Sequence, residues 1–220
     1  MPRTSYQDEL ATLRGEVGAM ADLTLDRYWE AVEVLESGDP QQAQRIIDGD
    51  TELNDWYLDI ERECIDLIAL QQPLASDLRF VASSFKIVTD LERIGDLACN
   101  LAEYGRELGG TTDVDVEPIA RLAGEMVEAA MAAYTTADAD TARSVVVRDE
   151  QLDGQCKRAS ETIVRQLVTD GVGAEPIDQR LQRVSRLLVT IRDIERVGDH
   201  AVNIAARTQY MIENDDDLIY

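Results

Sequence analysis

The chain contains one 13-residue segment twice. The first copy, residues 90–102, reads DLERIGDLACNLA, and the second copy, residues 193–205, reads DIERVGDHAVNIA, 103 positions later. A repeat of this kind in a 220-residue chain predicts two halves of similar structure, because a repeat unit buries its apolar face against its neighbours. The segment also determines where functional residues should be sought.

Each copy places an acid, a second acid and an amide at intervals of four residues. Residues four apart share one face of a helix, and two carboxylates at that spacing repel each other. A glycine inside a helix costs about 1 kcal/mol relative to alanine, and both copies contain one, Gly95 and Gly198. Both copies thus contain repelling acids and a helix-weakening glycine, and such locally unfavourable residues indicate a functional site. A bound cation would relieve the repulsion. The alternative is a solvated acidic face, which the flanking apolar residues make less favourable. The residues of the two stripes are Glu92, Asp96 and Asn100, and Glu195, Asp199 and Asn203.

The chain is strongly acidic, with 44 acidic and 21 basic residues and a formal net charge of −23. This charge argues against nucleic acid as a partner, and against free phosphate, nucleotides or anionic lipid as direct ligands, because phosphate binding needs basic residues. Divalent cations are the small ligands that it favours. Proteins of halophiles tolerate such self-repulsion, so the composition predicts a halophilic archaeal source, with an acidic mesophilic protein as the alternative.

Three cysteines, Cys64, Cys99 and Cys156, are widely spaced and include no CxxC pair. This usage predicts reduced thiols rather than a disulfide framework or a zinc site. No leader sequence or membrane-spanning run is visible. We therefore expect a cytoplasmic protein that does not span a membrane.

Apolar residues recur at helical spacing along most of the chain, and no useful strand-like alternation is present. The pattern predicts an all-α protein of two tandem three-helix bundles, residues 1–110 and 111–220, linked near residues 111–117. The second half has about four extra residues near 169–174. The six predicted helices span about 5–36, 40–70, 74–109, 118–134, 140–168 and 176–213.

A second set of polar residues lies on the middle helix of each predicted bundle. Asp50 and Asn54 are four apart, as are Asp149 and Asp153. In an antiparallel bundle these side chains could face the acidic stripes. Carboxylate and amide oxygens suit Mg, Ca, Mn or iron better than zinc or copper.

Enzymatic activity is not expected from the sequence. His200 is the only histidine, and no Glu-x-x-His motif of a ferritin-like di-iron centre precedes it. His200 aligns with Leu97 of the first copy, which indicates a core or interface position. No glycine-rich phosphate loop follows a predicted strand.

The doubled motif resembles that of the PhoU family of phosphate-transport regulators. The residues that carry the resemblance are 91–96 (LERIGD), 194–199 (IERVGD) and the segment 72–79 (QPLASDLR). The resemblance implies a cytoplasmic, non-enzymatic regulator that acts with the ATP-binding subunit of a phosphate ABC importer. In many bacteria such proteins also act with a sensor kinase, so the resemblance implies a sensor kinase as a second partner. It also implies a homodimer that reaches a membrane only through its partners.

The resemblance further implies metal binding through the acidic motifs, by iron, Mg, Mn, Ca or Zn. Asn54 departs from that pattern because an acid would complete the first set. Two other functions stay open: a carboxylate-bridged metalloenzyme or metal store, and a structural adaptor without a phosphate role. The metal ligands that the resemblance implies are Glu92, Asp96, Glu195, Asp199, Asp50, Asp149 and Asp153, with Asn100 and Asn203 as further oxygen donors.

Overall fold

The architecture was obtained as a computed structural model, which describes residues 3–71, 73–110, 114–169 and 176–215. These residues form helices joined by short connections, and no strand occurs among them. The all-α prediction is therefore confirmed. The helices are α1 (Arg3–Ser37), α2 (Pro40–Asp48), α3 (Asp50–Gln71), α4 (Ala75–Leu108), α5 (Glu117–Thr136), α6 (Ala139–Thr169) and α7 (Ile177–Glu213).

The second predicted helix, 40–70, is divided at Gly49 into α2 and α3. The Gly49 N–H still bonds to the Arg45 carbonyl at 3.1 Å, but the Glu52 N–H bonds to the Gly49 carbonyl three residues back. Glycine holds a helical conformation weakly, which favours a break at this position. The counterpart helix α6 runs without a break from Ala139 to Thr169.

The helix starts follow from capping chemistry. Asp39 accepts hydrogen bonds from the N–H groups of Gln41 and Gln42, and Pro40 occupies the first turn of α2. The sequence leaves Asp138 and Asp140 as alternative caps for α6. Asp138 is the cap, because its Oδ1 accepts from the N–H of Asp140 at 3.0 Å.

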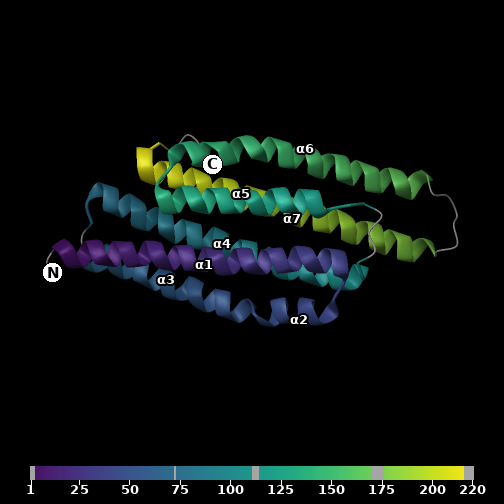
Figure 1. Ribbon diagram of the computed structural model, residues 1–220, viewed down its shortest axis with the longest axis horizontal. Coiled ribbons are helices and arrows are strands. Elements are labelled where there is room, and N and C mark those ends of the chain that lie inside the picture. The colour runs from purple at the N-terminus through teal and green to yellow at the C-terminus, as the bar shows by residue number, and fades with distance from the viewer. Residues whose placement is uncertain (1–2, 72, 111–113, 170–175, 216–220) are drawn as a thin grey trace.

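The two halves have matching layouts. In the second half, α5, α6 and α7 repeat the arrangement of α1, α2–α3 and α4 (Figure 1). Gly38 and Ala137, 99 positions apart, end the first helix of each half, and both have positive φ angles, of 65° and 54°. Ala137 accepts a left-handed conformation there that glycine adopts at lower cost. The four extra residues expected near 169–174 fall almost wholly outside the described residues.

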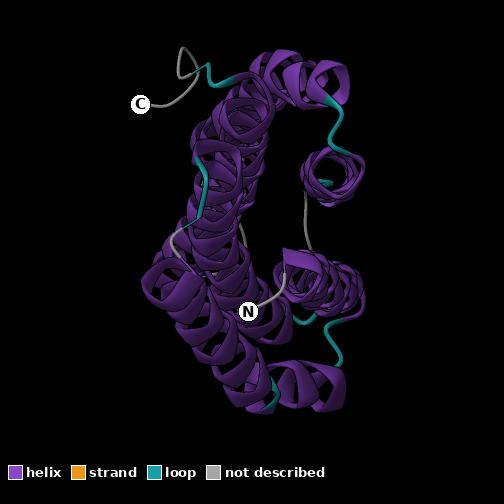
Figure 2. Cartoon of the chain, turned by 90° about the vertical axis from the view of Figure 1, so that its left-hand side faces the viewer, coloured by secondary structure: helices purple, strands orange, loops and turns teal. Residues whose placement is uncertain are grey.

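The halves pack against each other along their long axes (Figures 1 and 2). Helix α4 lies against α7, and α1 lies against both α4 and α5. The buried apolar side chains form one continuous core that includes residues of both halves, among them Leu91 and Ile194 of the repeated segments. The proposed boundary between residues 110 and 111 therefore divides two repeats that share a core.

Among the helices that the structure describes, none is long and apolar enough to cross a lipid bilayer.

Candidate functional site

The glycine of each repeated segment brings two helices close together. A Cβ atom at Gly95 of α4 would overlap the Cδ2 atom of Leu53 on α3. A Cβ atom at Gly198 of α7 would likewise overlap the Cδ2 atom of Leu152 on α6. The glycines thus allow the neighbouring helix, with its acidic residues, to approach the acidic stripe. This explains why a residue of poor helix propensity occurs at the same place in both copies.

We call the acids of the second half the second cluster: Asp149 and Asp153 on α6, and Glu195 and Asp199 on α7. Helices α6 and α7 pack against each other, so these four acids lie close enough to repel one another. Burial raises the pKa of Asp149 to about 6, and repulsion by Asp153, Asp199 and Glu195 adds to the effect. Burial also raises the pKa of Glu195 and of Asp199, with repulsion from Asp153 next in importance for both. Ionisation of all four acids at once is therefore unfavourable, because they are partly buried and repel one another.

One oxygen of the second cluster has no protein donor. Asp149 Oδ1 is buried and lacks a hydrogen-bond partner in the described part of the chain. It lies 3.6 Å from the position that a Cβ at Gly198 would occupy. An unpaired buried carboxylate oxygen is costly, and a cation would compensate for it.

The first cluster, Asp50 on α3 with Glu92 and Asp96 on α4, is compensated by protein groups. Asn54 donates a hydrogen bond from Nδ2 to Asp50 Oδ2 at 2.9 Å. Arg93 lies 3.4 Å from Glu92 and donates to Asp96 at 3.1 Å. Burial still raises the pKa of Glu92, and repulsion by Asp96 and Asp50 contributes.

A buried arginine from α1 also accompanies the first cluster. Arg27 pairs with Glu52 at 2.8 Å, while its Nη1 atom is buried without a hydrogen-bond partner among the described residues. Burial raises the pKa of the Cys99 thiol, and the positive charge of Arg27 partly offsets that rise. The same thiol donates to Asp50 Oδ1 at 3.7 Å. The counterpart of Arg27, 99 positions later, is the fully buried Met126. The second cluster thus lacks both the buried cation and the amide that the first cluster has.

The corresponding arginine of the second copy has a different partner. Arg196 donates to Asp193 Oδ1 at 3.2 Å. Its proximity and that of His200 only partly offset the rise in the pKa of Asp199. The two clusters therefore differ in their neutralising groups even though their motifs match.

The two asparagines predicted as additional metal ligands lie at the α4–α7 interface. Asn100 donates to Asp193 Oδ2 at 3.4 Å, and Asn203 donates to Asp90 Oδ1 at 3.2 Å. The same Asp90 oxygen lies 2.9 Å from His200 Nδ1. His200 is thus an interface residue. The role of Asn100 and Asn203 as metal ligands stays a prediction.

In the described part of the chain, no group of three or more His, Cys, Asp or Glu side chains is arranged closely enough to hold a metal ion. The donor set nevertheless fits a hard cation, because the second cluster offers several carboxylates and an unpaired buried oxygen. A cation there would require these side chains to turn toward each other.

Comparison with known proteins supports the pattern of two repeats. Residues 17–105 and 116–208 each match the PhoU domain. The chain belongs to the PhoU family. A PhoU homologue from Pseudomonas aeruginosa, described as a phosphate-specific transport system accessory protein, is 33% identical, with 96% of this chain and 86% of that protein covered. A homologue of the same description from Clostridium acetobutylicum is 30% identical over 96% of each chain.

Solved PhoU structures have the same fold. The crystal structure of PhoU from P. aeruginosa superposes with a TM-score of 0.87 at 32% identity, covering 96% of this chain and all of that one. A PhoU structure from Streptococcus pneumoniae, titled as a phosphate transport system regulatory protein, gives 0.86 at 27% identity, covering 96% and 98%. The resemblance inferred from the doubled motif is confirmed.

Sequence reasoning missed several residues that shape these PhoU sites. Asp90 and Asp193 begin the repeated segments, but only the packing of α4 on α7 shows that they bind residues of the other half. Arg27 lies on a different helix, outside the 13-residue repeated segment. The one available signal was the exchange of Arg27 for Met126 at equivalent positions.

Proposed function

We propose that this protein is an accessory regulator of phosphate uptake that acts on a phosphate ABC importer. Support comes from the match of both halves to the PhoU domain and from relatives described as phosphate-specific transport system accessory proteins. The direct partner in this proposal is the importer's cytoplasmic ATP-binding subunit, and the protein reduces uptake when phosphate is plentiful. A sensor kinase is a second partner where the source organism has one, and the protein acts as a homodimer without enzymatic activity.

The observation that carries a regulatory rather than a catalytic role is the chemistry of the clusters. Both consist of carboxylates, and their polar neighbours are amides, arginines, the Cys99 thiol and one another. The only histidine is bound to Asp90. These groups can bind a cation and transmit its presence through helix packing.

Cation binding belongs to this proposal, and the second cluster is its principal site. Asp149, Asp153, Glu195 and Asp199 would hold the ion. The ion would supply the positive charge that Arg27 provides in the first half and that Met126 does not provide in the second. The first cluster binds more weakly, because Asn54, Arg93 and Arg27 already provide compensating groups. Iron, Mn, Mg, Ca and Zn are the candidate ions.

The regulatory role is tested by adding the purified protein to the ATP-binding subunit of the phosphate importer from the same genome. We expect saturable binding and a changed rate of ATP hydrolysis, and a strain lacking the gene should take up more phosphate when phosphate is abundant. A deletion strain with unchanged uptake, together with a subunit that neither binds nor responds, would leave the structural adaptor as the better explanation.

Cation binding is tested by metal analysis of untagged protein purified without chelator. The variant E195Q/D199N should lose most of the bound metal, whereas the matched variant E92Q/D96N should lose little. Equal trace amounts in the wild type and both variants would rule out a specific site. A redox-active metal accompanied by turnover would favour the metalloenzyme or metal store instead.

A further inference from the structure

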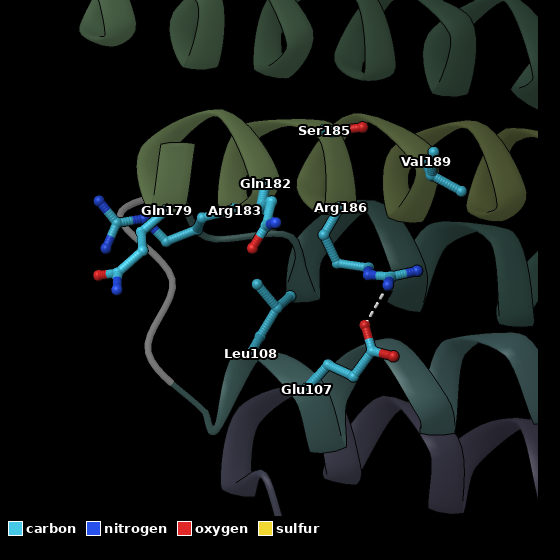
Figure 3. A pocket seen from close by; sticks show the side chains of 8 residues that line it. All are labelled: Glu107, Leu108, Gln179, Gln182, Arg183, Ser185, Arg186 and Val189. Atoms are coloured by element: carbon cyan, nitrogen blue, oxygen red, sulfur yellow. Dashed lines mark ion pairs between the residues drawn. The ribbon is translucent and has the colours of Figure 1, made fainter. Parts of the chain in front are cut away.

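A cavity of about 720 Å³ lies between the end of α4 and the first half of α7. Its walls come from Glu107 and Leu108 on α4 and from six residues of α7 (Figure 3). Its size is within the range of small-molecule sites. The α7 residues that line it are Gln179, Gln182, Arg183, Ser185, Arg186 and Val189.

The charge of this region is opposite to that of the chain. Residues 177–192 contain four arginines and a single acid, Asp178, in a protein whose net charge is −23. The whole-chain charge disfavours anionic ligands, but binding depends on the charges near the ligand, because those beyond about 10 Å are screened at ordinary salt concentrations. An anion beside this part of α7 would therefore meet positive charge despite the net charge of the chain.

The basic residues are not part of the internal repeat. The positions in α4 that correspond to Arg180, Arg183 and Arg186 are occupied by Asp77, Phe80 and Ser83. Packing of α7 alone therefore does not require arginine at these positions. The arginines of the cavity therefore come from the second half only.

The lining residues supply hydrogen-bond donors in suitable number. Besides two arginines, the cavity has two glutamine amides and the Ser185 hydroxyl, and its only acid is Glu107. Gln182 and Arg186 point from α7 toward Leu108 and Glu107 (Figure 3). A guanidinium group can bind two phosphate oxygens through two parallel hydrogen bonds. Neutral amides and hydroxyls add donors without repelling an anion.

Arg186 is held in place before any ligand arrives. Its guanidinium lies 5.0 Å from the centre of the Tyr104 ring and forms an ion pair with Glu107. The Tyr104 hydroxyl in turn donates to Asp193 at 3.1 Å. A cation fixed on an aromatic ring loses little freedom when an anion binds, which favours binding.

We propose that this cavity binds a phosphate group, either of free inorganic phosphate or of a nucleotide. Arg186 provides the charge beside Glu107, and Gln182 provides an amide donor on the same side of α7 (Figure 3). Arg183, which points toward Gln179 instead, adds a second positive charge at the edge of the cavity. The anion competes with Glu107 for Arg186. This weakens a contact between α4 and α7, the helices that join the two halves. This binding can be measured on the purified chain, so it is independent of whether the protein regulates an importer.

The test is calorimetric titration of the full chain at low ionic strength with inorganic phosphate and, separately, with ATP in the presence of chelator. The variant R183Q/R186Q should weaken binding at least about tenfold, because each charge-assisted hydrogen bond contributes this much or more. The control variant R192Q removes an exposed arginine of the same helix outside the cavity and should change affinity less than about twofold. Thermal melts of all three proteins establish that each is folded.

Each outcome has a defined meaning. Binding of phosphate without ATP assigns the site to the free ion, whereas competition between the two ligands assigns it to a phosphate group that a nucleotide can supply. The proposal is overturned if neither ligand binds the folded wild type, or if R192Q weakens binding as much as R183Q/R186Q. Equal affinity for sulfate, or binding of an acidic peptide alone, would overturn the assignment to phosphate.

Discussion

Asp90 of α4 accepts a hydrogen bond from Asn203 of α7 at 3.2 Å, and the reciprocal pair, Asp193 and Asn100, joins the same helices at 3.4 Å. Each aspartate begins one repeated segment, and each asparagine lies ten residues further along the other. The repeated segments therefore join the two halves of the protein as well as supplying the acidic clusters. The two contacts differ in burial, since the Asp193 side chain is 7% exposed and that of Asp90 is 15% exposed.

The variant D193A should be destabilised by about 2–4 kcal/mol, because it leaves Asn100, Tyr104 and Arg196 without their acceptor. D193N carries the same charge as D193A but keeps one acceptor oxygen, so it should lose less. D90A should also lose less than D193A. Urea denaturation measures all three, and equal stability of D193A and wild type would show that the buried contacts contribute nothing.

Substitution of the motif glycines by alanine should separate the packed helices. G95A and G198A should each cost about 1–3 kcal/mol, because the new methyl group overlaps Leu53 or Leu152. G15A on α1 is the control, since no atom lies within 4 Å of its new Cβ, and it should gain up to about 1 kcal/mol from helix propensity. Thermal unfolding distinguishes the two effects. Stabilisation by G198A would contradict the close packing of α6 and α7.

A carboxyl pair outside the clusters should make stability depend on pH. Burial raises the pKa of Glu63 to about 7, and a hydrogen bond and repulsion from Glu16 contribute. The folded state therefore keeps a proton that the unfolded state releases near pH 4.5. The free energy of unfolding should fall as the pH rises from about 4.5 to 7. Because Glu63 is only partly buried, the loss should be about 1 kcal/mol or less.

The variant E63Q should remove that part of the pH dependence, whereas E161Q, an exposed position on α6, should leave it unchanged. Urea midpoints between pH 4.5 and 8 provide the measurement. Parallel pH profiles for E63Q and wild type would exclude Glu63 as the titrating group.

The difference between the clusters should be transferable. In a D149N/D153N background, where the second cluster is disabled, the added changes N54D and R27M give the first cluster the residue types of the second. We expect this variant to bind Mn²⁺ measurably by calorimetry, because an acid replaces an amide and a buried cation is removed. R27M alone in the same background is the control. Absence of binding by the folded N54D/R27M variant would show that these two residues do not explain the difference.

Salt should stabilise the protein. Screening of a net charge of −23 favours the compact state, so raising KCl from 0.1 to 2 M should increase the melting temperature by about 10 °C. Circular dichroism melts test this expectation. A melting temperature that does not change with KCl would favour the acidic mesophilic alternative over a halophilic source.

Much of the fold could be predicted from the sequence because helices are specified locally. The Asp39-Pro40 cap and the left-handed Gly109 fix helix ends through contacts with neighbouring residues, and apolar spacing fixes the buried faces. The break at Gly49 was missed because a single glycine inside a helical pattern is compatible with either a continuous or a divided helix.

The sequence by itself determined that the protein is helical, that it consists of two similar halves, and that acidic residues share one face in each half. These properties depend on residues within one or two helical turns of each other. Only the tertiary structure decided which groups meet across helices. Arg27 reaches the first cluster from α1, Asn100 and Asn203 bind acids of the opposite half, and Arg186 meets Glu107 and Tyr104. The two matching motifs have different charged and polar neighbours, because different side chains pack against each of them.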